Sequence, residues 1–119
     1  MPSTYKLDKP PINTPQIYET ENIDLNDKIV TAHYHLPGVG WDIYVLEYDQ
    51  ETNEIFCWAE LIPGCGEFGY QNLSHLEEIE VDIPIVKNEK IVGKLTSRME
   101  FDNRWQNKKL SEIIESRNK

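Results

Sequence analysis

Alternation of apolar and polar positions dominates the middle of the chain and predicts β-strands. Residues 29–36 and 41–48 alternate with a period of two, and residues 54–62 repeat the pattern after a polar loop at 49–53. In 41–48 both sets of alternate positions carry apolar or aromatic side chains, which is typical of a strand covered on both faces. Because the connections are short, the three runs predict an antiparallel meander.

The alternation also assigns side chains to the faces of this sheet. Residues two apart along a strand point to the same side. We therefore expect Val30 to share a face with Tyr34, and Tyr48 to share a face with Tyr44 and Leu46.

The segment after the third strand is expected to leave the sheet. Residues 63–69 are rich in glycine and predict an irregular break. Asn72 can then cap a short helix, because Leu73, Leu76 and Ile79 recur at helical spacing behind it.

Two further strands and a last helix are expected in the C-terminal third. Residues 83–86 and 91–99 are predicted strands around a turn at 87–90, and Pro84 suggests an edge position. Residues 110–114 predict a brief helix. The expected fold is therefore of the α+β class: an antiparallel sheet of four to five strands, with one short helix packed on it and a short C-terminal helix.

The domain organisation follows from proline content and length. Residues 1–16 contain four of the seven prolines and little apolar content, which predicts a flexible N-terminal tail. Residues 17–119 remain as a single domain, within the usual length of one hydrophobic core. The start of the chain lacks the apolar stretch of a secretory signal, and no run is long enough to span a bilayer, so we expect a cytoplasmic protein with no membrane contact.

Charge is distributed unevenly along the sequence. The net charge is −9, yet residues 1–82 hold 16 acidic and 3 basic residues, whereas residues 83–119 hold 5 acidic and 9 basic ones. Residues 29–86 hold 11 carboxylates and no Lys or Arg. Such a surface repels nucleic acid and attracts a basic protein.

Eight acidic residues and two aromatic residues are the candidate contacts for that basic partner. The acidic candidates are Asp49, Glu51, Glu54, Glu67, Glu77, Glu78, Glu80 and Asp82. Tyr48 and Tyr70 lie next to predicted turns, where a tyrosine can take part in an interface. The alternative interpretation is that the acids only keep the domain soluble.

A metal site is the second possibility that the residues raise. His33 and His35 lie two apart on a predicted strand, so both rings project from one face and could share a metal ion. A third ligand could come from His75, Asp42 or Glu47, but no metalloprotease or nuclease spacing accompanies the pair. The alternative is two exposed histidines on a half-buried strand.

Two smaller motifs are expected to carry no chemistry. Residues 64–69 match the dinucleotide pattern G-x-G-x-x-G, but the strands before them indicate hairpins rather than a parallel βαβ unit, and Glu67 would place a carboxylate beside a pyrophosphate. Cys57 and Cys65 are too few for a disulfide framework and are expected to be free thiols. We therefore expect no cofactor and no catalytic residue.

Several segments together resemble a known family. They are residues 28–30, 41–49, 66–70, 73–79 and 110–113. In this order they are similar to the small bacterial proteins grouped as domain of unknown function 2958, over roughly residues 17–114. The resemblance implies a gene carried on plasmids, integrative elements or phages, and it implies no activity.

The first function hypothesis is accordingly a non-catalytic, acidic protein-binding module of a mobile genetic element. Its partner would be a basic host or element-encoded protein, and a DNA mimic that inhibits a nucleic-acid-binding defence protein, of the anti-CRISPR or anti-restriction type, would suit the charge. The alternatives are a metal-dependent hydrolase or nuclease that uses His33 and His35, and a structural accessory subunit.

Overall fold

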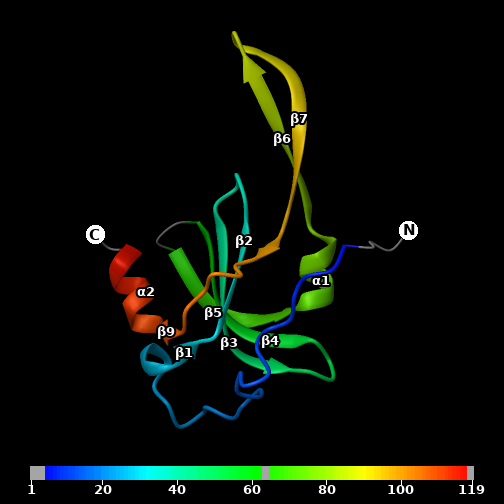
Figure 1. The fold of residues 1–119 in the computed structure, drawn as a ribbon. Coiled ribbons are helices and arrows are strands. Elements are labelled where there is room, and N and C mark those ends of the chain that lie inside the picture. Colours follow the sequence, from blue (N-terminus) through cyan, green and yellow to red (C-terminus); the bar gives the residue numbers. More distant parts are fainter. Residues whose placement is uncertain (1–4, 63–64, 118–119) are drawn as a thin grey trace.

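The computed structural model describes residues 5–62 and 65–117 (Figure 1). Their helices and strands follow one another along the chain as the 3-10 helix η1 (Leu25–Asp27), β1 (Ile29–Val30), β2 (Ala32–Leu36), β3 (Trp41–Asp49), β4 (Glu54–Ile62), β5 (Cys65–Asn72), α1 (Leu73–Glu78), β6 (Glu80–Lys87), β7 (Lys90–Arg98), β8 (Glu100–Phe101), β9 (Lys108–Lys109) and α2 (Leu110–Arg117). This arrangement confirms the α+β class.

The central sheet has five strands in the order β5-β4-β3-β2-β8, with antiparallel neighbours throughout. The predicted meander supplies β2, β3 and β4. The expected break at residues 63–69 is wrong for residues 65–69, because these residues belong to β5 and pair with β4. Residues 63 and 64 lie outside the described residues. Gly66 is needed within β5 for steric reasons. A Cβ at this position would lie 2.3 Å from the Trp58 ring, so only glycine leaves room for that indole.

Each face of the sheet is covered by its own hydrophobic core. The first core packs β2, β3 and β4 against α1 and the N-terminal segment, and the second core packs the opposite face against α2. The first core contains Leu7, Ala32, Tyr34, Leu36, Ile43, Val45, Tyr48, Ile55, Cys57, Leu73, Leu76 and Met99. The second contains Val30, Tyr44, Leu46, Leu110 and Ile113. The expectation that β3 is covered on both faces is thus confirmed.

Two irregularities move side chains to the face opposite the expected one. Thr31 separates β1 from β2, so Val30 joins the second core while Tyr34 lies in the first. A bulge between Val45 and Glu47 shifts the register of β3 on β4, so Tyr48 lies in the first core and not beside Tyr44. An inserted residue reverses the alternation, which a pattern of period two cannot anticipate.

Several of residues 5–16, in the segment predicted as a tail, contact the body. Leu7 is buried in the first core, and its backbone N–H donates to Glu77 Oε2 at 2.8 Å. The Tyr34 hydroxyl donates to the carbonyl of Asp8, and the backbone N–H of Tyr48 donates to the carbonyl of Pro15. Burial of Leu7 and these hydrogen bonds offset the conformational entropy of an extended segment.

The last two long strands form a separate two-stranded hairpin, β6–β7, which we call the arm. The arm projects from the end of the sheet that lies opposite η1 (Figure 1). The prediction of two strands around a turn at residues 87–90 is confirmed, but these strands do not join the central sheet. Of the described helices, none is long and apolar enough to cross a membrane.

Candidate functional site

A groove of about 470 Å³ lies between the segment before β1 and strands β4 and β5. Its lining residues are Tyr18, Glu21, Ile23, Asp24, Leu25, Lys28, Glu47, Phe56 and Tyr70. We call it the acid-rimmed groove. Residues 17–28 carry no regular strand or long helix, so their position depends on contacts with the sheet.

Glu47 on β3 supplies those contacts. Its side chain is buried and accepts hydrogen bonds from the backbone N–H groups of Tyr18 at 3.0 Å and Thr20 at 3.1 Å, and from the Thr20 hydroxyl. The ammonium of Lys28, also buried, lies 3.9 Å from the Glu47 carboxylate and donates to the carbonyl and hydroxyl of Thr20. A buried charge needs such partners, so Glu47 and Lys28 hold this segment in place.

The open part of the groove is aromatic and aliphatic. Tyr18 is 64% exposed and Tyr70 is 47% exposed, and their ring centroids lie 6.5 Å apart. Ile23 and Leu25 are also exposed on the same lining. Burial and hydrogen bonding with the Tyr18 hydroxyl raise the pKa of Tyr70, so its phenol stays protonated and neutral.

Two exposed carboxylates lie beside this apolar floor. Glu21 and Asp24 line the groove and are exposed, and Glu54 lies close enough to Tyr70 to raise the pKa of its phenol. Among the described lining residues, Lys28 is the one cation, and it is buried against Glu47. The groove therefore offers apolar contact and negative charge together, which suits the aliphatic stem and charged end of Lys or Arg.

The predicted acidic candidates are divided by the structure into two groups. Asp49, Glu51 and Glu54 lie at the turn between β3 and β4, and Glu67 lies on β5. Within the described residues none of these four takes part in an ion pair. Asp49, Glu51 and Glu54 lie near the end of the sheet that carries the groove, whereas Glu67 lies towards the other end of β5, opposite Ala59. All four remain candidates for contact with a basic partner.

Most of the other acidic candidates make intramolecular hydrogen bonds or ion pairs. Glu77 bonds the Leu7 backbone, Glu80 lies 3.1 Å from Arg98, and Asp82 lies 3.0 Å from Lys94. The continuous acidic surface expected across the helix and the following strand is therefore not formed, because β7 brings cations alongside β6. Glu78 is exposed on α1.

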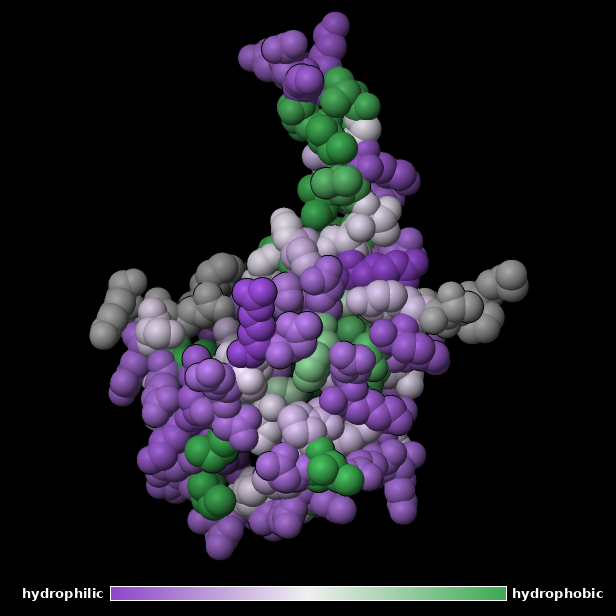
Figure 2. Space-filling model, in the orientation of Figure 1, coloured by the Kyte–Doolittle hydropathy of each residue, from purple (hydrophilic) through white to green (hydrophobic). Residues whose placement is uncertain are grey.

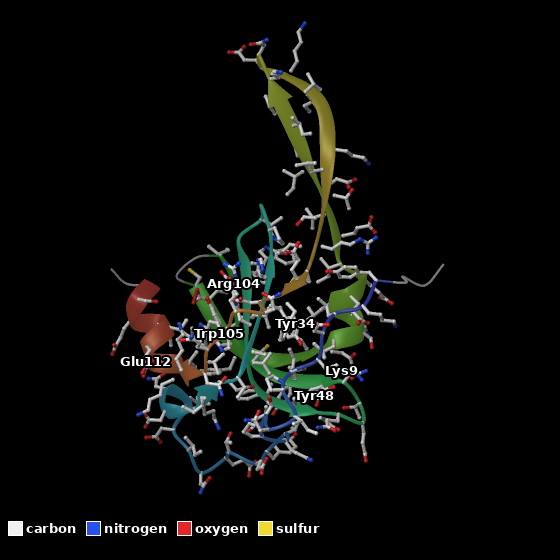
Figure 3. The ribbon with its side chains drawn as sticks, in the orientation of Figure 1. Lys9, Tyr34, Tyr48, Arg104, Trp105 and Glu112 are labelled. Carbon is white, nitrogen blue, oxygen red and sulfur yellow. The ribbon has the colours of Figure 1, made fainter. Side chains whose placement is uncertain are left out.

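The two aromatic candidates differ in accessibility. Tyr48 is only 3% exposed and lies in the first core, so the expectation that it contacts a partner is wrong. Tyr70 lines the groove and is open to solvent. The N-terminal segment, which carries Lys9, packs against the first core. Figure 3 shows Tyr48 and Tyr34 beside this segment.

His33 is held between two carboxylates. Its Nε2 lies 2.7 Å from Asp42 Oδ1 and its Nδ1 lies 3.0 Å from Asp102 Oδ2. Burial lowers the pKa of His33, but the hydrogen bonds to Asp42 and Asp102 outweigh burial and raise it. The ring stacks on Tyr44 at 4.8 Å and lies 5.3 Å from Trp105, whose indole donates to the Val30 carbonyl on the side covered by α2 (Figure 3).

This arrangement does not favour the alternative of a metal site at His33 and His35. Both ring nitrogens of His33 face carboxylates, and His35 Nε2 lies 3.9 Å from Glu100. In residues 5–62 and 65–117, no three His, Cys, Asp or Glu side chains are grouped so that they could hold a metal ion. Instead, the hydrogen bonds of His33 with Asp42 and Asp102, which we call the His33 clamp, connect the segment after β8 to β2 and β3.

The cysteines are free thiols in the structure, as expected. Cys57 is buried, and burial raises its pKa to about 12, which keeps the thiol protonated and unreactive at neutral pH. Cys65 is exposed at the start of β5.

Comparisons with protein-family models, with curated proteins and with solved structures gave no match for this chain. The resemblance to domain of unknown function 2958 therefore stays a prediction.

Most residues of the groove were not predictable from the sequence. Tyr70 was among the predicted contacts, but Tyr18, Ile23 and Leu25 were not, because residues 17–28 have no periodic pattern. The sequence signal for the groove is that this segment mixes acidic residues, which are usually exposed, with isolated apolar residues. The spacing of these apolar residues fits neither a helix nor a strand.

Proposed function

We propose that the protein is a non-catalytic protein-binding module, and that the acid-rimmed groove takes a segment of a partner that is both apolar and cationic. The observation that supports this proposal is the pairing of exposed Tyr18 and Tyr70 with the carboxylates of Glu21 and Asp24 on one lining. Tyrosine is favoured at interfaces because a rigid ring contributes large contact area at low entropic cost.

The geometry of the groove suits binding and not catalysis. Its buried charges, Glu47 and Lys28, are occupied in holding Tyr18 and Thr20 in place. The exposed acids would accept charge from Lys or Arg, while the apolar floor would bury the stem of the same side chain. Electrostatic attraction to this rim would also speed encounter at low salt.

The test uses a synthetic peptide of alternating valine and lysine, titrated by calorimetry against the full chain. A valine and glutamate peptide of the same length is the control ligand. We expect binding of the lysine peptide alone, weakening as salt rises. The double change Tyr18→Ser and Tyr70→Ser is expected to weaken binding by about tenfold or more.

A matched acidic pair sharpens the test. Glu21→Gln with Asp24→Asn removes two rim charges, whereas Glu78→Gln with Glu112→Gln removes two exposed charges outside the groove lining. Only the first pair is expected to reduce affinity and salt dependence. Equal binding of both peptides, or no response to the groove variants, would contradict the proposal.

The finer proposal concerns the biological partner. The finer proposal is supported by the resemblance to domain of unknown function 2958 and by four acids that take part in no ion pair within the described residues: Asp49, Glu51, Glu54 and Glu67. They favour a mobile-element protein that occupies the nucleic-acid site of a basic host defence protein. A pull-down from host lysate at low and high salt tests it. The expected result is capture of a nucleic-acid-binding protein that DNA competes away, and capture that DNA does not affect would contradict it.

A further inference from the structure

The arm is a two-stranded ribbon that extends beyond the cores. β6 and β7 pair with each other from Glu80 and Arg98 at the base to Lys87 and Lys90 at the tip. The tip turns sharply, with Asn88 at φ 52° and Glu89 at φ 64°. Positive φ at both central residues is the geometry that suits a two-residue hairpin turn.

The arm leaves large apolar side chains in solvent. They are Ile85, Val86, Ile91, Val92 and Leu95, each at least 39% exposed. Val86 and Ile91 lie directly opposite each other next to the tip. Figure 2 shows the hydrophobic colour running along the arm above the largely hydrophilic body. An isolated two-stranded hairpin is marginally stable in water, and a contiguous exposed apolar patch marks an interaction site.

Contacts with the body are confined to the base of the arm. Ile83 approaches Gly38, where an added Cβ would lie 2.6 Å from the Ile83 Cδ1, and the Ser97 hydroxyl donates to the carbonyl of Pro37 at 2.6 Å. Nearer the tip, the ribbon stands clear of the body (Figure 1). Its distal half is therefore not covered by its own chain.

The tip carries positive charge without a partner on the arm. Lys94 and Arg98 are paired with Asp82 and Glu80 across the ribbon. In the part of the chain that the structure describes, Lys87 and Lys90 take part in no ion pair. The tip thus combines two exposed apolar side chains with two lysines that are outside these ion pairs, and Glu89 between the lysines leaves the turn with one net positive charge.

We propose that the tip of the arm binds the acid-rimmed groove of a second copy of this chain. Val86 and Ile91 would lie on the apolar floor, and Lys87 and Lys90 would meet the carboxylates of the rim. Charge complementarity supports this occupant, because Glu21 and Asp24 are exposed acids, whereas the tip at residues 87–90 has two lysines and one acid, Glu89, and so keeps a net positive charge. The inference rests on the proposed function, since it names the segment that the groove takes.

In the proposed dimer the exchange would be reciprocal, since each copy has one arm and one groove, and these lie at opposite ends (Figure 1). The groove lies beside η1, and the arm projects from the other end of the sheet, so the arm does not reach the groove of its own chain. Two copies related by a twofold axis would seat both arms at once. Such isologous pairing is the usual symmetry of a dimer.

The experiment is sedimentation equilibrium of the full chain from micromolar to millimolar concentration, at low and high salt. We expect a monomer and dimer equilibrium that shifts to monomer as salt rises. Lys87→Glu with Lys90→Glu, and separately Glu21→Lys with Asp24→Lys, are each expected to weaken the dimer by about tenfold or more. Lys9→Glu with Arg104→Glu makes the same change in charge as the arm variant on the body, where Figure 3 labels both residues, and is expected to leave the dimer intact.

A mixture of the two reversed variants gives the decisive result. In the mixed pair both contacts join opposite charges: the unchanged arm of the groove variant meets the unchanged groove of the arm variant, and the reversed arm meets the reversed groove. A heterodimer is therefore expected where neither variant self-associates. Circular dichroism of each variant checks its folding independently. A monomer at all concentrations, a mixture that does not associate, or a dimer that the groove variant leaves unchanged would overturn the inference.

The same samples separate this inference from the proposed function. If the wild-type chain stays monomeric and yet binds the valine and lysine peptide through Tyr18 and Tyr70, the proposed function stands and the second copy is not its partner. If it neither dimerises nor binds the peptide, both fail.

Discussion

The central sheet and the arm are both built from antiparallel strands in which apolar and polar side chains alternate. They differ in how far the apolar side chains are buried. In β3 the apolar residues of both faces are covered, by the first core on one side and by the second on the other. In the distal arm the corresponding positions of β6 and β7 lie in solvent. Strand pairing alone therefore does not make a core: α1, α2 and residues 5–16 cover the sheet, and no described element covers the distal arm.

The largest expected effect is a difference between two isoleucines. Ile55 is fully buried in the first core, whereas Ile91 is 73% exposed on the arm. Ile55→Ala is expected to lower the free energy of unfolding by about 2–5 kcal/mol, because it leaves a cavity. Ile91→Ala is expected to change it by less than about 0.5 kcal/mol. Urea unfolding of dilute samples measures both, and similar losses would remove the distinction between body and arm.

Two glycines, one in the sheet and one in the arm, differ in the space available for an added side chain. An added Cβ on Gly66 overlaps the Trp58 indole, but on Gly93 it lies 3.7 Å from Ile85, an ordinary contact. Gly66→Ala is expected to cost about 1–3 kcal/mol through overpacking. Gly93→Ala is expected to be neutral or slightly stabilising, since alanine restricts the unfolded chain. Thermal or urea unfolding of the two variants decides, and a harmless Gly66→Ala would contradict the Trp58 packing.

The His33 clamp gives the body a pH dependence. The pKa of His33 is raised, so its stabilising effect is fully present below the ordinary histidine value near 6.5 and is lost as pH rises through the folded value. The hydrogen bond from His33 lowers the pKa of Asp102, whose contribution is lost as pH falls below the ordinary aspartate range. His33→Gln is therefore expected to cost about 1–2 kcal/mol near pH 5.5 and less at pH 8.5. A cost that does not change between these two pH values, measured by urea unfolding, would show that His33 is not protonated in the clamp.

The smallest effect is expected from the ion pair on the arm. Hydrogen bonds from Lys94 and Thr96 lower the pKa of Asp82, yet all three side chains are exposed. Solvent screens such a pair, so Asp82→Asn is expected to leave the unfolding midpoint of a dilute sample unchanged. A clear loss of stability would mean that the arm contributes to global folding.

The positions of the strands and helices were more predictable from the sequence than what packs against each of them. Alternation located β2, β3 and β4, and the spacing behind Asn72 located α1, where the Asn72 side chain accepts from the Ser74 N–H. The same alternation occurs in residues 83–86 and 91–99, and nothing in it says that these strands leave the sheet. A period of two reports which side chains share a face but not what covers that face.

The candidate site was less predictable for two physical reasons. Counting carboxylates along the sequence does not show which of them a neighbouring strand neutralises, as Lys94 and Arg98 do for Asp82 and Glu80. The groove also depends on Glu47, an acid inside a strand, whose role follows from burial beside Lys28. Both facts require contacts between residues far apart in the chain.

Amide hydrogen exchange of the full chain tests most directly whether the body is self-sufficient while the arm needs a partner. In a dilute, high-salt sample, the amides at Ile43–Val45 of β3 are expected to exchange slowly and those of β7 near the tip to exchange fast. In a concentrated, low-salt sample, the tip amides are expected to gain protection while the β3 amides stay as they were. Tip amides as protected as β3 in the dilute sample, or protection that does not respond to concentration, would contradict the account.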